Sequence, residues 1–409
     1  MSKNNIRKVS YDILSDVFYN KKLLNNLIDE KFDNFALSAE DKSFVKRECS
    51  GVIENLDFID EKINKFSKIK TKKLDKEVLI ALRIGIYEIF FCDKVPEFAT
   101  INESVNLVKM SKKEKLSGYV NAVLRKVAND KNDNNNIDSK NANITTKRCY
   151  FKIYNDKEKD VINELNLKNI NYKKYDGALD FIYSKVYYLD NYKDIIELDN
   201  FKDGNILIMD ASSIYLTDKL AYYIREREKD IKVGTKNDQI SMIKLLDTCA
   251  APGGKILSLI DLIYDDYVYF YAEARDISEE KILKICENVN RLKIIDLNLL
   301  VKDATIHDDI DDDKYDVMIL DVPCTGLGVI DKKPDIKLNY SDKKRDSLVK
   351  IQRDILSATK HYVKKGGIIS YSTCTETKEE NEDNIDDFLK ENLDFEKIFE
   401  KKIFRSIPC

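Results

Sequence analysis

The sequence predicts an all-α N-terminal domain, a small α+β module and a Rossmann-like α/β domain, in that order along 409 residues. Three observations lead to this prediction. Apolar residues recur at helical spacing through residues 1–128, and a run rich in Asn, Asp and Lys follows. From about residue 205 the pattern changes to an alternation of strands and helices, which is typical of a parallel sheet.

The first domain is predicted to span residues 1–128 and to pack around one central helix. Residues 78–91 are apolar on most faces, which indicates a helix that is buried on all sides. The sequence Thr100-Ile101-Asn102-Glu103 has the spacing of a capping box and predicts that a helix starts there. Further helices are expected through residues 105–110 and 119–127.

Residues 129–146 are predicted to be a disordered linker, because they contain two isoleucines and no aromatic residue. Such a segment cannot bury enough apolar surface to offset the entropy lost on ordering. Residues 147–204 form the predicted α+β module. The module combines a helical stretch at 156–165 with short β-like runs at 149–154, 179–183 and 186–189.

Residues 205–409 are the predicted α/β domain, with helices expected at 278–291 and 346–363. The candidate strands are residues 244–247, 268–274, 297–302, 317–321 and 367–372. In an open parallel sheet the carboxyl ends of the strands share one edge, and ligands bind at that edge.

The composition excludes several classes of site. The chain has eight cysteines without a C-x-x-C pair and only two histidines, so no metal site is expected. The N-terminus is polar and basic, and no apolar run approaches about 18 residues. We therefore expect free thiols in a reducing cytoplasm and no membrane segment.

The charge is unevenly distributed between the predicted domains. Residues 1–128 carry 24 Lys and Arg against 19 Asp and Glu, and the whole chain has a net charge of −4, which leaves −9 for the remainder. A mildly basic first domain followed by an acidic remainder of the chain is compatible with nucleic-acid binding.

A glycine-containing loop and four aspartates mark the predicted ligand edge. Residues 245–255 leave the first strand and open a helix, whose N-terminus offers N–H donors and a positive dipole end. Asp247, Asp276, Asp303 and Asp321 each stand at or just after the end of a strand. One such Asp is usually a helix cap or a turn residue, but four in register favour a cofactor that carries a nucleoside.

Two cysteines are expected at the same edge. Cys324 follows the fourth strand and Cys374 follows the fifth, so adjacent strands would bring the two thiols together. A thiolate there could act as a nucleophile, with Lys255 as a candidate source of the positive charge that lowers a thiol pKa. The other cysteines are interpreted as small buried apolar residues, apart from Cys249 in the glycine-containing loop and the terminal Cys409.

These motifs resemble the RNA cytosine-C5 methyltransferases. The resemblance covers about residues 205–390 and rests on residues 247–255, 321–324 and 371–375, with further matches at 210–213, 334–337 and 380–382. The first domain resembles the antiterminator NusB through Val95-Pro96 and residues 101–105 and 120–125. The combination is similar to the RsmB (Sun/Fmu) family of bacterial 16S rRNA (cytosine-C5)-methyltransferases.

The resemblance implies the cofactor S-adenosylmethionine and a role for each matching residue. Cys374 would be the nucleophile that adds to C6 of cytosine, Cys324 would assist product release, and Asp321 would contact the base, with no metal required. The implied cofactor-binding residues are Cys249, Ala250, Ala251, Pro252, Gly253, Gly254, Lys255, Asp276, Asp303 and Asp321. The implied partner is 16S rRNA, naked or in an early small-subunit particle, bound by a monomer that contacts neither DNA nor membrane.

The chain departs from the family pattern in two places. The Asn-rich linker stands where relatives carry helices with a His-Pro-x-x-Trp-like segment. The chain also stops before the family's Gly-Phe-Phe-containing strand, so we expect a sheet without its last strand.

Three alternatives to this function stay open. The first is a NusB-like RNA-binding or assembly factor whose shortened methyltransferase domain is inactive. The second is a cytosine-C5 methyltransferase that acts on another RNA. The third is a DNA cytosine-C5 methyltransferase, in which the cysteine of the Pro-Cys dipeptide is the nucleophile.

Overall fold

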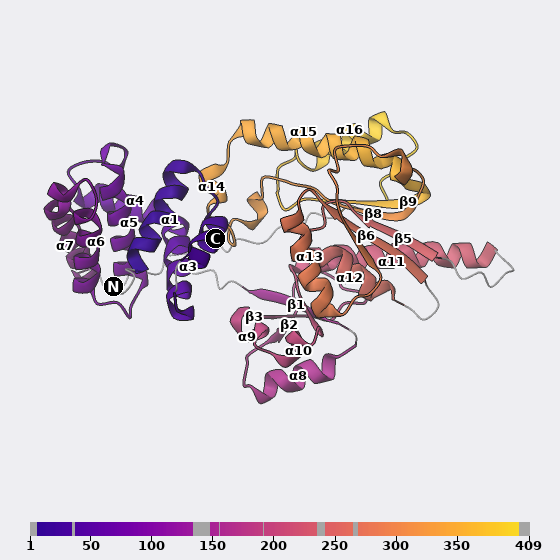
Figure 1. Ribbon diagram of the computed structural model, residues 1–409, viewed down its shortest axis with the longest axis horizontal. Coiled ribbons are helices and arrows are strands. Elements are labelled where there is room, and N and C mark those ends of the chain that lie inside the picture. Colours follow the sequence, from indigo (N-terminus) through magenta and orange to yellow (C-terminus); the bar gives the residue numbers. More distant parts are fainter. Residues whose placement is uncertain are drawn as a thin grey trace. The chain divides into compact units, whose positions relative to one another are not determined.

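A computed structural model describes residues 6–34, 37–133, 148–154, 156–190, 192–234, 242–264 and 269–400. The chain forms two compact units. Unit 1 comprises residues 1–145 and 329–340, and unit 2 comprises residues 146–328 and 341–409. The predicted fold class is confirmed: unit 1 is helical, and unit 2 contains a small antiparallel sheet and a parallel sheet (Figure 1).

Unit 1 packs around one helix, α5, as its sequence predicts. Helix α5 (Lys76–Phe91) is buried from Val78 to Phe90 and contacts α1, α3, α4, α6 and α7. The surrounding helices are α1 (Ile6–Asn20), α2 (Leu24–Asn34), α3 (Ala39–Glu54), α4 (Leu56–Phe66), α6 (Glu97–Lys109) and α7 (Ser117–Asp133), with 3-10 turns at Thr71–Lys73 and Glu114–Leu116.

The helix start predicted at Thr100 is wrong. Helix α6 begins at Glu97, and Pro96 precedes it with an extended backbone. The hydroxyl of Thr100 caps nothing, because it is buried and donates a hydrogen bond of 2.6 Å to Glu88 on α5.

Helix α7 continues to Asp133, five residues into the stretch predicted as a linker. Contacts with other helices hold its last turns. Asp130 lies 3.2 Å from the ammonium of Lys62 and 2.9 Å from that of Lys65, and Lys131 donates to the carbonyl of Ile89. The rest of the predicted linker, residues 134–146, lies outside the described residues.

A short segment from the second half of the chain completes unit 1. Residues 329–340 include the short helix α14 (Ile336–Asn339), and Leu338 packs against the helical core. The buried Asp335 accepts a hydrogen bond of 3.1 Å from the backbone N–H of Leu24, at the first turn of α2. A carboxylate is favourable at this position, since the N–H groups of the first helical turn lack partners within the helix.

Unit 1 buries a carboxyl group that has no hydrogen-bond partner among the described residues. Glu48 on α3 is 1% exposed, and both its side-chain oxygens lack a partner there. It lies beside Glu88, which pairs with Arg7 at 2.6 Å. Burial, followed by the charge of Glu88, raises the pKa of Glu48 well above its usual value.

We expect Glu48→Gln to stabilise the protein at pH 8 by about 1–3 kcal/mol, because the neutral amide cannot become a buried charge beside Glu88. A carboxyl whose pKa is higher in the folded state favours folding below its unfolded pKa of about 4.3, and this contribution is lost as pH rises toward the folded value. The gain should therefore be small at pH 5 and large at pH 8 in thermal unfolding of the full chain. Glu40→Gln, on the exposed part of the same helix, is the control. An equal gain at both pH values would contradict the explanation.

The small sheet of unit 2 has the antiparallel order β2-β3-β1-β4. Its strands are β1 (Cys149–Ile153), β2 (Lys173–Lys174), β3 (Val186–Leu189) and β4 (Ile206–Ile208), and the helices α8 (Glu158–Leu167), α9 (Tyr192–Ile196) and α10 (Asp199–Lys202) accompany them. Its core includes Phe151, Val161 and Leu165.

The strand predicted at 179–183 is wrong, since this segment forms no strand. The buried carboxylate of Asp218 accepts the backbone N–H groups of Ile182, Tyr183 and Ser184 at 2.6, 3.0 and 2.7 Å. These donors are therefore not available to a neighbouring strand.

The parallel sheet of unit 2 has the order β7-β6-β5-β8-β9. The strands are β5 (Met242–Asp247), β6 (Tyr269–Asp276), β7 (Leu297–Val301), β8 (Tyr315–Asp321) and β9 (Val363–Ser372). All five predicted strands are present, although β9 begins four residues earlier than expected. The strand order reverses between β5 and β8, which is where open α/β sheets bind ligands.

Helices cover both faces of the parallel sheet (Figure 1), and adjacent residues of β5 belong to different core clusters. Leu245 packs with α11 (Ala211–Gly234), α12 (Gly254–Ile263) and α13 (Glu279–Leu292). Leu246 packs with α15 (Asp342–Thr359) and α16 (Glu382–Glu391). The described part of this sheet has five strands, and residues 401–409 lie outside the described residues. None of the described helices has the length and apolar character needed to cross a membrane.

Candidate active site

The glycine-containing loop connects β5 to α12 at the switch point of the parallel sheet. Gly253 is the N-cap of α12 with φ of 95°, a backbone conformation that favours glycine. A Cβ atom there would also lie 3.0 Å from Ile285. The backbone N–H of Ala251 donates to Asp276 at 3.0 Å, which ties the loop to the end of β6. The loop thus presents the first turn of α12 close to the strand ends.

Asp276 and Asp303 differ in their exposure and in the hydrogen bonds that their carboxylates accept from other protein groups. Asp276 is 3% exposed and also accepts hydrogen bonds of 2.8 Å from the N–H of Ile277 and from Lys281. Asp303 is exposed and accepts from the N–H and hydroxyl of Thr305 at 2.9 and 2.7 Å. A carboxylate offers about four acceptor positions, so each retains capacity for a further donor.

Asp321 ends β8 and forms the closest ion pair of the site. The ammonium of Lys255 lies 2.5 Å from one carboxylate oxygen, and the hydroxyl of Ser372 donates to the other at 2.9 Å. Lys255, expected from the sequence to supply charge to a thiol, therefore has Asp321 as its ionic partner.

Asp247 is the fourth strand-end aspartate. Its side chain is buried, and one oxygen has no hydrogen-bond partner among the described residues. Burial, with the charge of Asp321 adding to it, raises the pKa of Asp247 to about 8. Beside the loop, an acceptor without a partner marks a place where a ligand could bring a donor or a positive charge.

The two predicted cysteines lie together at the carboxyl ends of β8 and β9. Their sulfur atoms are 2.9 Å apart, and the backbone N–H of Cys374 donates to the Cys324 sulfur at 3.2 Å. Cys374 is exposed, whereas Cys324 is partly buried. The hydrogen bond with Cys374, followed by burial, raises the pKa of the Cys324 thiol far above its usual value. This hydrogen bond and burial therefore favour the protonated form of the Cys324 thiol.

Gly328 allows the two cysteine loops to approach each other. Its N–H donates to the carbonyl of Cys374 at 3.0 Å, and a Cβ atom at this position would lie 3.0 Å from the same oxygen. Sequence reasoning missed Gly328 and Ser372. Ser372 is the last residue of β9, and Gly328 lies four residues after Cys324. Their closeness to the strand ends that carry the cysteines was the signal that could have found them.

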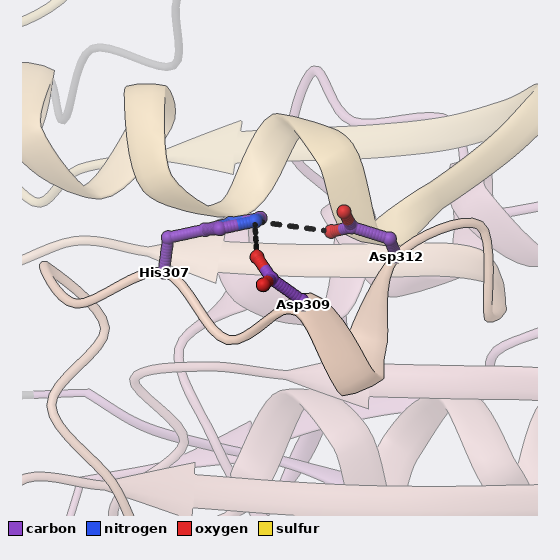
Figure 2. Close-up of side chains that lie close together, drawn as sticks. All are labelled: His307, Asp309 and Asp312. Atoms are coloured by element: carbon purple, nitrogen blue, oxygen red, sulfur yellow. Dashed lines mark ion pairs between the residues drawn. The ribbon is translucent and has the colours of Figure 1, made fainter.

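An exposed cluster of one histidine and two aspartates, His307, Asp309 and Asp312, lies in the segment after β7 (Figure 2). The Nε2 atom of His307 lies 3.0 Å from Asp309 and 3.4 Å from Asp312, and its Nδ1 lies 2.8 Å from the carbonyl of Ala358. The hydrogen bond with Ala358, helped by the two aspartates, raises the pKa of His307. An ion-paired histidine accounts for this geometry.

Comparisons with known proteins agree with these observations. A family model described as 16S rRNA methyltransferase RsmB/F matches residues 230–404, and the NusB family model matches residues 4–129. The chain belongs to the RsmB/F methyltransferase family. The RsmB/F match contains every site residue predicted from the sequence, from Cys249 to Cys374.

Full-length relatives of this RsmB/F chain carry related names. The probable ribosomal RNA small subunit methyltransferase B of Bacillus subtilis (strain 168) is 26% identical over 427 residues, covering 97% of this chain and 90% of the relative. The ribosomal RNA small subunit methyltransferase B of Proteus mirabilis (strain HI4320) is 25% identical, covering 95% and 92%. The crystal structure of PH0851 has a TM-score of 0.67 at 19% identity, covers 95% of this chain and 90% of its own, and shows the shared fold.

Membership in RsmB/F places this chain among the S-adenosylmethionine-dependent RNA methyltransferases. The family does not support the alternative of a DNA methyltransferase. The N-terminal unit belongs to the NusB family, as the sequence resemblance implies.

Proposed function

We propose that this protein transfers a methyl group from S-adenosylmethionine to C5 of a cytosine in 16S rRNA. The observation that carries the proposal is the pair of thiols 2.9 Å apart at the carboxyl ends of β8 and β9, on the same edge of the sheet as Asp321, the last residue of β8. The relatives named ribosomal RNA small subunit methyltransferase B support the choice of rRNA.

The residues at the switch point fit the cofactor. Residues 249–255 bring small side chains and the positive end of α12 to the strand edge, and Asp276 and Asp303 retain acceptor capacity for hydroxyl or amine donors. The partnerless oxygen of the buried Asp247 fits a positively charged group nearby. When bound, the cofactor supplies a methyl group activated by its sulfonium centre.

Cys374 carries the proposed chemistry. Its thiolate adds to C6 of cytosine and breaks the C5–C6 double bond, which makes C5 nucleophilic enough to accept a methyl group. A hydrogen bond between Asp321 and N3 or N4 of the base would stabilise this adduct. Transfer of the C5 proton to solvent water, which reaches the exposed Cys374, and departure of the Cys374 thiolate then restore the aromatic ring. The thiol of Cys324 is placed to donate a hydrogen bond to the leaving sulfur.

The target cytosine must leave its stack to reach these thiols. Unstacking costs a few kcal/mol and is easiest in a loop or a single strand. The NusB-family unit, with its small excess of Lys and Arg, is the proposed RNA-binding part.

Bisulfite sequencing of rRNA from cells with and without the gene for this protein tests the proposal. We expect one cytosine of 16S rRNA to lose its protection when the protein is absent. Protection lost in another RNA would favour the alternative substrate class. Unchanged protection everywhere would favour the RNA-binding factor, and the absence of heat on titration with S-adenosylmethionine would confirm that the methyltransferase domain is inactive.

A further inference from the structure

A fully buried carboxylate lies beneath the two cysteine loops. Glu380 is 0% exposed and accepts four hydrogen bonds. One oxygen accepts from the backbone N–H of Thr325 at 2.8 Å and from Gln352 at 3.1 Å. The other accepts from the hydroxyls of Thr325 and Thr377 at 2.5 and 2.7 Å. These donors fill about all the acceptor positions of a carboxylate.

The network around Glu380 holds the loop that carries Cys324 on both sides of the cysteine. Thr325, the residue after Cys324, binds Glu380 through its backbone and its hydroxyl. The carbonyl of Pro323, the residue before it, accepts a hydrogen bond of 2.9 Å from Gln352, which also donates to Glu380.

The same network reaches the loop that carries Cys374. The hydroxyls of Thr325 and Thr375 are 2.9 Å apart. Asn381, next to Glu380 in sequence, accepts from the hydroxyl of Thr373 at 2.6 Å and donates to the carbonyl of Thr375 at 3.1 Å. The neighbours of Cys374 on both sides are therefore held as well.

We propose that Glu380 is a positioning residue that sets the separation of the Cys324 and Cys374 thiols. Both cysteines lie on loops beyond their strands, and Glu380 with its neighbour Asn381 holds residues on both sides of each cysteine. Direct hydrogen bonds between the loops, such as that from the N–H of Gly328 to the carbonyl of Cys374, add to this network. Their role in methyl transfer rests on the proposed function. The fixed separation itself follows from the hydrogen bonds.

Replacing Glu380 with Gln changes the number of acceptors without changing the shape. One carboxylate oxygen becomes an NH₂ group, which faces donors instead of accepting from them. With the carbonyl oxygen of Gln toward the backbone N–H of Thr325 and the amide of Gln352, the NH₂ group faces the two threonine hydroxyls, which must rotate to accept from it. All of these hydrogen bonds then lose the assistance of the negative charge, and bonds to a neutral group are roughly half as strong, so the loops are freer to separate.

The thiol pair reports its own geometry in a redox titration that does not depend on methyl transfer. In full-length protein equilibrated with reduced and oxidised dithiothreitol, Cys324 and Cys374 lose two protons and two electrons to form a disulfide. The cyclic disulfide of the reagent gains them and becomes a dithiol. Mass spectrometry of digested protein measures the fraction of the Cys324–Cys374 disulfide, and hence the effective concentration of one thiol at the other.

We expect Glu380→Gln to lower this effective concentration about tenfold or more, because fixed groups have far higher effective concentrations than loosely tethered ones. Glu379→Gln is the matched control, since Glu379 is the preceding residue and pairs at the surface with Arg345 at 3.0 Å. An effective concentration that is unchanged in Glu380→Gln would overturn the proposal.

Two further variants keep the test decisive if Glu380→Gln unfolds. Thr325→Val removes one hydroxyl without changing the volume and should give a smaller decrease in the same direction. Glu380→Asp keeps a carboxylate and should restore part of the loss.

In methyl-transfer assays Glu380→Gln should lower kcat while the KM for RNA stays the same. If the wild-type protein transferred no methyl group, the proposed function would be wrong. The redox titration would still test whether Glu380 positions the two thiols.

Discussion

Cys374→Ala should abolish methyl transfer to rRNA, with a loss of at least about a thousandfold. Without the thiolate no adduct forms at C6, and C5 of cytosine stays too weak a nucleophile to accept the methyl group. The exposed sulfur of Cys374 is the one that a base can reach, while the Cys324 thiol is more buried and keeps its proton. Incorporation of radiolabelled methyl groups from S-adenosylmethionine into rRNA measures the loss.

Cys286→Ala is the matched control for this substitution. Cys286 lies on α13 and is partly buried, and its sulfur accepts a hydrogen bond from Asn290 of the same helix. The control should retain full activity and affinity for the cofactor. An active Cys374→Ala protein together with an inactive Cys324→Ala protein would assign the nucleophile to the Pro-Cys dipeptide and contradict the mechanism.

Cys324→Ala should accumulate a covalent complex between protein and RNA. The Cys324 sulfur lies 2.9 Å from that of Cys374, and the hydrogen bond between them together with burial keeps the Cys324 thiol protonated. Removing this thiol leaves the addition step intact and slows the release of Cys374 from the methylated base. A band of lower mobility on a denaturing gel under turnover conditions measures the complex.

The double variant Cys324→Ala/Cys374→Ala provides the control, because it lacks the nucleophile and should give no such band. Thr325→Val tests whether the complex results from a disturbed loop, since it loosens the same loop but keeps the Cys324 thiol. If Cys324→Ala turned over without any retarded band, Cys324 would have no part in release.

The elements that could be predicted from sequence are those with a strong local pattern. Helix α5 is apolar on nearly every face, and this pattern requires burial on all sides. The five parallel strands end in short polar or small-residue segments, so their carboxyl ends, with Asp321 and the two cysteines, could be placed at one edge. The alternation of strands and helices along the sequence is therefore enough to predict where the site lies.

The predictions that were wrong concern residues whose partners lie far along the chain. Residues 179–183 have a β-like composition, but Asp218 on α11 takes their backbone donors. Thr100 has capping-box spacing, yet its hydroxyl binds Glu88 on another helix. In both cases a long-range hydrogen bond overrides the local preference.

The sequence by itself determined the order of the domains, the parallel sheet and the group of residues at its carboxyl edge. These features depend on periodicity and on spacing, which are properties of short segments. The tertiary structure alone decided the pairing of Lys255 with Asp321, the 2.9 Å separation of the thiols and the burial of Glu380. Hydrogen bonds and ion pairs act over a few ångströms, so they depend on which distant segments the packed core brings together.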